Sequence, residues 1–186
     1  MRCRGIVGSV VLALTAVGCS LQESPHVGEI SKAMKLVDRG VAYLRTGELN
    51  RAEAAFSVAY EVGKVSAALD GLGSVAYLRG ENRKAERLFW RAYNEDPEYH
   101  RSLGNLALLY EKEGNYSEAL TMYRRAIKEN PDDYRIRANY ASFLAQHVEK
   151  GRMPYEAEFE LMKAESLADH PIIRHNKKVL AEGRYR

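Results

Sequence analysis

Small, apolar and turn-forming residues recur at a fixed interval through the middle of the chain. Glycine, alanine and proline each return after 34 residues, in the pairs Gly80 and Gly114, Ala85 and Ala119, Ala92 and Ala126, and Pro97 and Pro131. A period of this length is typical of stacked structural units. It divides the central chain into one unit at residues 66–99 and another at residues 100–133. The high alanine and charged content and the scarcity of proline favour short helices and turns over strands.

Both units resemble the tetratricopeptide repeat (TPR), a pair of helices joined by a tight turn. The second unit has the family's large, small, aromatic, glycine and proline positions at Leu103, Leu106, Ala107, Tyr110, Gly114, Ala119, Tyr123, Ala126 and Pro131. The first unit has these positions at Leu69, Leu72, Gly73, Gly80, Ala85, Phe89, Ala92 and Pro97. The resemblance implies that small residues allow the helices to approach closely and that aromatic side chains fill the space between units.

Weaker units flank these two. Residues 33–65 keep the pattern but are one residue short, with Lys64 in place of the proline, and residues 134–167 form a degenerate unit with three or four extra residues around 151–154. Residues 168–186 contain a last amphipathic helix and the tail, and such a helix caps the end of a solenoid. We therefore expect an all-α TPR superhelix, an α-solenoid of about four helix-turn-helix repeats plus a C-terminal capping helix.

Residues 1–18 have the features of a secretory signal peptide. Arg2 and Arg4 precede an apolar run at residues 6–14, which is shorter than the roughly 20 residues that span a bilayer. The small residues before Cys19 resemble the lipobox of bacterial lipoproteins, although Ala16 stands where leucine is usual. The resemblance implies that Cys19 is lipidated and that residues 19–32 form a tether. A plain secreted protein and an uncleaved anchor are the alternatives.

Lipidation would hold the protein at the bacterial cell envelope. Several acyl chains keep a protein on a membrane far more durably than one. Ser20 after the cysteine is similar to the residue in lipoproteins that are sorted to the outer membrane. We therefore expect a lipid-anchored protein on the outer membrane, facing the periplasm.

The resemblance also implies a binding groove lined by the first helix of each pair. The candidate groove residues are Val37, Val41, Leu44, Tyr77, Arg101, Asn105, Leu108 and Arg135. The groove begins apolar and becomes polar and basic, which suits a peptide or helix with an apolar end and an acidic or carboxylate-bearing end. The carboxylate clamp of chaperone-tail adaptors is matched only in part, because Asp70 and Ser74 stand where a lysine and an asparagine are expected.

The composition gives little support to other functions. The 28 Lys and Arg residues against 25 Asp and Glu give a formal charge of +3, which is too small to indicate a nucleic-acid partner. Two cysteines and five histidines are too few for a disulfide scaffold or a typical zinc site. The sequence has neither a phosphate-binding glycine loop nor a serine-nucleophile motif. We expect no catalytic residue, no metal, no cofactor and no small-molecule substrate.

These features together predict a non-catalytic protein-binding scaffold. Small lipid-anchored arrays of this kind resemble the pilotins of type IV and related pili, which help an outer-membrane secretin to assemble. The resemblance implies that the groove holds a segment of an envelope protein such as a secretin. The alternative is an adaptor or accessory subunit for envelope enzymes such as peptidoglycan hydrolases or proteases.

Overall fold

The computed structural model describes residues 27–147 and 154–183, and in these ranges all regular structure is helical. The signal segment, Cys19 and most of the predicted insertion at residues 151–154 lie outside the described residues. The helices are α1 (Val27–Arg45), α2 (Leu49–Gly63), α3 (Ser66–Leu78), α4 (Asn82–Glu95), α5 (Arg101–Lys112), α6 (Tyr116–Glu129), α7 (Tyr134–His147), α8 (Pro154–Leu167) and α9 (Pro171–Gly183).

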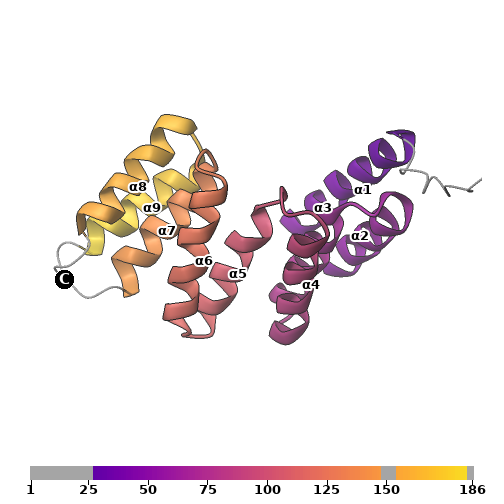
Figure 1. The fold of residues 1–186 in the computed structure, drawn as a ribbon, viewed down its shortest axis with the longest axis horizontal. Helices are drawn as coiled ribbons and strands as arrows, with labels where there is room; N and C mark the ends of the chain where they lie inside the picture. The colour runs from indigo at the N-terminus through magenta and orange to yellow at the C-terminus, as the bar shows by residue number, and fades with distance from the viewer. Residues whose placement is uncertain (1–26, 148–153, 184–186) are drawn as a thin grey trace, which may run out of the picture.

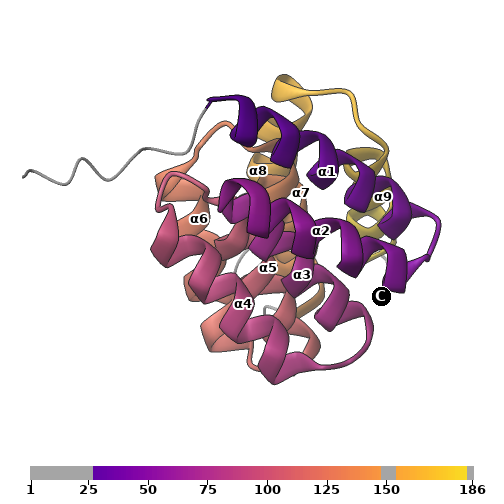
Figure 2. The ribbon, with the colours of Figure 1, turned by 90° about the vertical axis from the view of Figure 1, so that its right-hand side faces the viewer.

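Successive helices pack as antiparallel pairs that follow one another along the long axis of the molecule (Figure 1). Among the described helices, the first members α1, α3, α5 and α7 contact one another in sequence, whereas the backbones of the second members stay further apart. The array therefore curves toward its first helices. Helix α9 packs against both α7 and α8. Figure 2 views the array from its α1 end. The predicted all-α superhelix of four pairs and a capping helix is confirmed.

Glycines end the first three inner helices. Gly47, Gly80 and Gly114 have φ values of 76°, 77° and 77°, the left-handed region that costs glycine little. At the second of these turns, the amide of Glu81 donates to the carbonyl of Ala76 at 2.9 Å, which satisfies a carbonyl at the end of α3. The turn after α2 is different, because Lys64 takes the left-handed conformation there, with a φ of 49°.

The core follows the predicted pattern of small residues against aromatic rings. A Cβ atom built on Gly73 would lie 2.5 Å from Cε1 of Phe89, so the ring occupies the space that the missing side chain leaves. Gly40 and Gly71 make the same close approach to Phe56. Ala85, Ala107, Ala119, Ala141 and Ala157 are buried along the array. Close packing of these pairs fixes the distance between neighbouring helices.

Helix α1 begins earlier than the sequence pattern predicts. It starts at Val27, so the last six residues of the predicted tether are helical. The reason is a close contact with the end of α2: a Cβ on Gly63 would lie 2.5 Å from the Cβ of Ala33 and 3.2 Å from the carbonyl oxygen of Glu29. The sequence signal is weak there because Val27 remains 81 % exposed.

Candidate functional site: a polar pocket on the inner helices

A pocket of about 210 Å³ lies on the inner face of the array. Its walls come from α3, α5, α7 and α9 and from the turn before α7. The lining residues are Asp70, Arg101, Gly104, Asn105, Asp133, Arg135, Ile136, Asn139 and Ile172. A ligand in this pocket would contact three successive inner helices and the capping helix at once.

Asp70 is the buried carboxylate of the pocket, with 7 % of its surface exposed. The side-chain amide of Asn105 donates to both carboxylate oxygens, at 2.9 and 3.0 Å, and the hydroxyl of Tyr99 donates to one of them at 3.3 Å. Burial raises the pKa of Asp70 to about 6, and the hydrogen bonds from Asn105 and Tyr99 and the charge of Arg101 limit the rise. Asp70 therefore ties α3 to the next repeat and titrates just below neutral pH.

The second carboxylate of the pocket has a local structural role. Asp133 accepts hydrogen bonds from the backbone amides of Arg135 at 2.8 Å and of Ile136 at 3.2 Å. These amides are in the first turn of α7, where they have no partner within the helix, so Asp133 caps that helix.

Two arginines face the same space. The guanidinium carbon of Arg135 lies 5.3 Å from the centroid of the Tyr134 ring, and Arg101 is close enough to Asp70 to influence its pKa. The ion pairs within the described part of the chain join other residues and include neither of these arginines. Arginine binds carboxylates in a bidentate manner, so the pair offers donors for an acidic group.

The predicted groove residues do not all share one environment. Arg101, Asn105 and Arg135 are brought together in the pocket. Leu44, Tyr77 and Leu108 are half-buried, and Val41 is 36 % exposed.

Val37 was expected on the groove surface but lies in the core. It is only 7 % exposed and belongs to the N-terminal core, where it packs in one apolar cluster with Phe56. Its position in the repeat correctly indicated the inner helix. The long α1 and the close approach at Gly40 leave this side chain inside, however, so Val37 acts as a core residue.

The candidate groove residues left out six of the nine residues that line the pocket: Asp70, Gly104, Asp133, Ile136, Asn139 and Ile172. Asp133 precedes α7 and Ile172 lies on the capping helix, so neither occupies one of the repeat positions that usually face a groove. The aspartate just before a helix is a readable capping signal. Nothing in the repeat pattern could have placed Ile172, because the capping helix lies outside the repeats.

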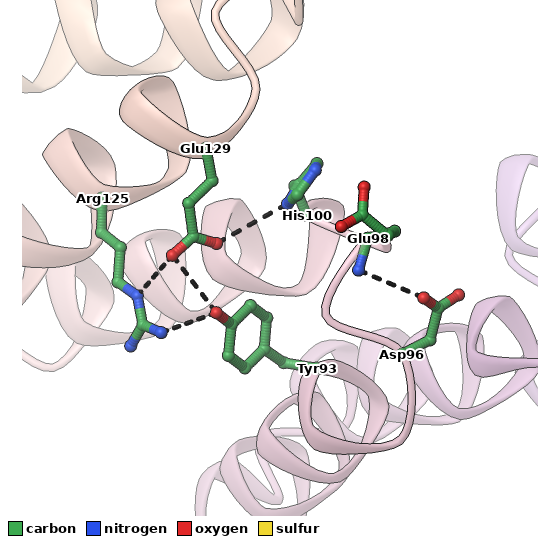
Figure 3. A network of polar contacts seen from close by, with 6 residues as sticks. All are labelled: Tyr93, Asp96, Glu98, His100, Arg125 and Glu129. Atoms are coloured by element: carbon green, nitrogen blue, oxygen red, sulfur yellow. Dashed lines mark hydrogen bonds and ion pairs between the residues drawn. The ribbon is translucent and has the colours of Figure 1, made fainter.

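A second polar arrangement joins the outer helices (Figure 3). The hydroxyl of Tyr93 on α4 donates to Glu129 on α6 at 3.2 Å and accepts a hydrogen bond from Arg125 at 2.6 Å, while Arg125 pairs with Glu129 at 2.8 Å. His100 Nδ1 lies 3.6 Å from the other oxygen of Glu129. We call Tyr93, Arg125 and Glu129 the tyrosine clasp.

The tyrosine clasp has a counterpart one repeat earlier. The hydroxyl of Tyr60 on α2 donates to Glu95 at 3.0 and 2.9 Å, and Arg91 pairs with Glu95 at 2.7 Å. Arg91 and Glu95 precede Arg125 and Glu129 by one 34-residue period. The outer helices, whose backbones are further apart, are therefore joined by long polar side chains, and this spacing shapes the curvature of the inner face.

The described residues contain no group of three or more His, Cys, Asp or Glu residues arranged to hold a metal ion. Of the helices within residues 27–147 and 154–183, none is long and apolar enough to cross a membrane.

Comparison with known proteins supports the repeat assignment. The profile of the tetratricopeptide repeat matches residues 100–133, the second of the two regular units. Among curated proteins, the chain is 28 % identical over 102 residues to protein O-mannosyl-transferase TMTC2 of Mus musculus. That match covers 49 % of this chain but only 12 % of the relative. The chain thus spans a small part of that enzyme's length.

Solved structures with the same fold come from several proteins. A Thermobaculum terrenum O-GlcNAc transferase mutant matches with a TM-score of 0.62 and 22 % identity, over 77 % of this chain and 28 % of that chain. A tetratricopeptide repeat protein from Parabacteroides merdae matches with a TM-score of 0.55 and 21 % identity, over 83 % of this chain and 60 % of that chain.

The protein YrrB, described as a TPR protein with an unusual peptide-binding site, matches with a TM-score of 0.51 and 20 % identity over 84 % of each chain. Such likenesses establish the fold and do not transfer a ligand. Residues 100–133 therefore form a tetratricopeptide repeat, and the chain has the superhelical fold of a tetratricopeptide-repeat protein.

Proposed function

We propose that this protein is a non-catalytic scaffold that binds a segment of another protein along its inner face. The observation that carries the proposal is the pocket in which Arg101 and Arg135 face the same space without an ion pair to the described carboxylates. An acidic side chain or a terminal carboxylate of the partner fits these donors. The TPR fold is typical of scaffolds, and its concave surface suits an extended chain or helix.

The other end of the inner face suits an apolar part of the same partner. Met34 and Val41 on α1 are 40 % and 36 % exposed, and Leu44 and Tyr77 lie half-buried nearby in the array. Burial of apolar surface contributes about 25 cal/mol for each Å² removed from water. The apolar contacts would supply affinity. The arginine pocket would set the orientation of the bound segment and the specificity for an acidic group.

A capture experiment with matched variants tests the groove. The native chain, Arg101→Gln with Arg135→Gln, and Arg83→Gln with Arg87→Gln on the outer helix α4 would each be used as bait with detergent-solubilised membranes. We expect mass spectrometry to identify a partner that is recovered by the native chain and the α4 variant and reduced at least about tenfold by the pocket variant. Equal recovery by all three baits would contradict a binding role for the pocket.

The proposed location is the bacterial envelope, with Cys19 as the lipid-bearing residue. The support is the sequence of residues 1–19, a signal segment that ends in small residues before a cysteine. After Cys19→Ser, the exported protein should be found in the soluble fraction and no longer in the membrane fraction. Unchanged membrane association would refute lipidation as the tether.

The proposed partner class is an outer-membrane secretin, in a pilotin-like role. A lipid anchor sets location and a groove holds a partner segment, which together are the two properties that such a role needs. The alternative partner is an envelope enzyme such as a peptidoglycan hydrolase or a protease. Changing Val41, Leu44 and Tyr77 to charged residues should abolish recovery of the true partner. Groove-dependent recovery of a hydrolase in place of a secretin would decide for the alternative.

A further inference from the structure

Two arginines and two aspartates line the pocket, and Asp70 is the buried member of this set. Arg101 and Arg135 supply two positive charges, and Asp70 and Asp133 supply two negative charges when both are ionised. Asp133 is held at the first turn of α7, where the helix amides offset its charge. Asp70 is therefore the carboxylate whose charge opposes an incoming acidic group most directly.

The surroundings of Asp70 fix it in this position. It lies on α3, and the groups that act on its carboxylate are Tyr99 from the turn before α5 and Arg101, Ser102 and Asn105 from α5. Arg101 is the charged one, and Tyr99 and Asn105 donate hydrogen bonds to the carboxylate. Across the pocket, α7 and its preceding turn contribute Arg135 and Asp133. Protonation of Asp70 would leave the hydrogen bond from Asn105 possible at one oxygen and would give the pocket a net positive charge.

We propose that Asp70 is the residue that sets the charge preference of the pocket, so that an acidic group binds tightly when Asp70 is neutral and weakly when it is ionised. This inference rests on the proposed binding of acidic segments at Arg101 and Arg135. It also explains the departure from a carboxylate clamp, because an aspartate stands where a lysine is expected. The burial that raises the pKa of Asp70 to about 6 places the change between mildly acidic and neutral pH.

Inorganic sulfate is a suitable probe, since it stays fully ionised across this range and its oxygens match guanidinium donors. The purified full-length chain would be titrated with sulfate at pH 5 and pH 8 at constant ionic strength, following the amide signals of Gly104 and Arg135 by NMR. We expect the wild type to bind at least about tenfold more tightly at pH 5, because a like charge a few ångströms away weakens binding about fivefold even in bulk water and more strongly within a protein. Equal affinity at the two pH values would overturn the inference.

Two variants separate Asp70 from other titrating groups. Asp70→Asn should bind sulfate at both pH values with the affinity that the wild type has at pH 5. Asp132→Asn, an exposed neighbour of the pocket turn, should keep the wild-type pH dependence. A pH dependence that survives in Asp70→Asn would overturn the proposal.

A measurement on the wild type alone covers the case in which Asp70→Asn does not fold. Because coupling between two binding events is reciprocal, bound sulfate should raise the pKa of Asp70, read from its ¹³C carboxyl shift, by about one unit for a tenfold effect. An unchanged pKa with sulfate bound contradicts the role of Asp70 and leaves the arginine pocket intact. Absence of sulfate binding at both pH values contradicts the arginine pocket itself, and with it the proposed function.

Discussion

Single residues show how much the fold depends on the exact environment of one side chain. Asp70 and Asp133 are both carboxylates in the same pocket, but one is buried between repeats and the other caps a helix. Burial disfavours the charged form of Asp70. Asp133 instead accepts hydrogen bonds from the first amides of α7. Two residues of the same type therefore have different roles in one pocket.

Asp70 should make stability fall as pH rises. Its pKa is raised from 3.8 to about 6 in the folded chain, so the folded state holds the proton more strongly than the unfolded state does. The stabilising effect is present below pH 3.8 and is lost as the pH rises through 6. Relative to Asp70→Asn, the wild type should lose about 2 kcal/mol of unfolding free energy between pH 4 and pH 7.

Urea denaturation of both proteins at several pH values would measure this difference. Using the difference between the two proteins removes the contributions of other groups, such as Glu53, whose pKa is lowered mainly by a hydrogen bond from Arg79. A difference that stays constant from pH 4 to pH 7 would show that Asp70 is not perturbed by folding.

Pairs of helices depend on two kinds of contact. Within a repeat, small residues and aromatic rings bring the helices close together, as at Gly73 and Phe89. Between the outer helices, the contacts are polar and reach further, as in the tyrosine clasp. The first kind also occurs between successive pairs, where Gly71 on α3 approaches Phe56 on α2. The second kind joins outer helices that have no close backbone contact.

Loss of the Tyr93 hydroxyl should weaken the contact between α4 and α6. Tyr93→Phe removes the hydrogen bonds with Glu129 and Arg125 and should reduce the unfolding free energy by about 1 kcal/mol. Tyr155→Phe is a suitable control, since Tyr155 is 84 % exposed and its variant should match the wild type. Thermal or urea denaturation measures the effect, and equal losses in the two variants would argue against the clasp.

Over residues 27–147 and 154–183, the molecule is an extended array in which each helix contacts only near neighbours. Stability in such arrays is close to a sum of local terms, so damage at one end should stay there. The C-terminal end depends on α9, where Asn176 is 4 % exposed and donates from Nδ2 to the carbonyl of Ala138 on α7 at 2.7 Å. That bond also helps to hold α9 in place, and α9 contributes Ile172 to the pocket.

Asn176→Ala should destabilise only the end of the array. The variant loses a buried hydrogen bond, at a local cost of about 1–3 kcal/mol. Hydrogen exchange should therefore become faster in α7 and α9 while α1 and α2 keep their protection. His175→Ala on the exposed side of α9 is the matched control. Faster exchange along the entire array would mean that the repeats unfold as one unit.

The repeated helix pair can be read directly from the amino-acid sequence. Glycines at the turns and small residues opposite aromatic rings recur every 34 residues, and each acts within one unit or on the next. Contacts within one unit or between adjacent units depend on the spacing of residues along the chain. The helical class, the turns and most of the core could therefore be predicted. The placement of Arg101, Asn105 and Arg135 on the inner helices followed from the same pattern.

The way in which these surfaces combine depends on the packing of the helices in three dimensions. The pocket joins residues from Asp70 to Ile172, on four helices and one turn, and the burial of Asp70 results from the way those elements meet. The same holds for Val37, which the packing of α1 against α2 placed in the core. Desolvation and the electrostatic balance of a pocket depend on all the groups that surround a residue, and no local pattern in the sequence encodes that set.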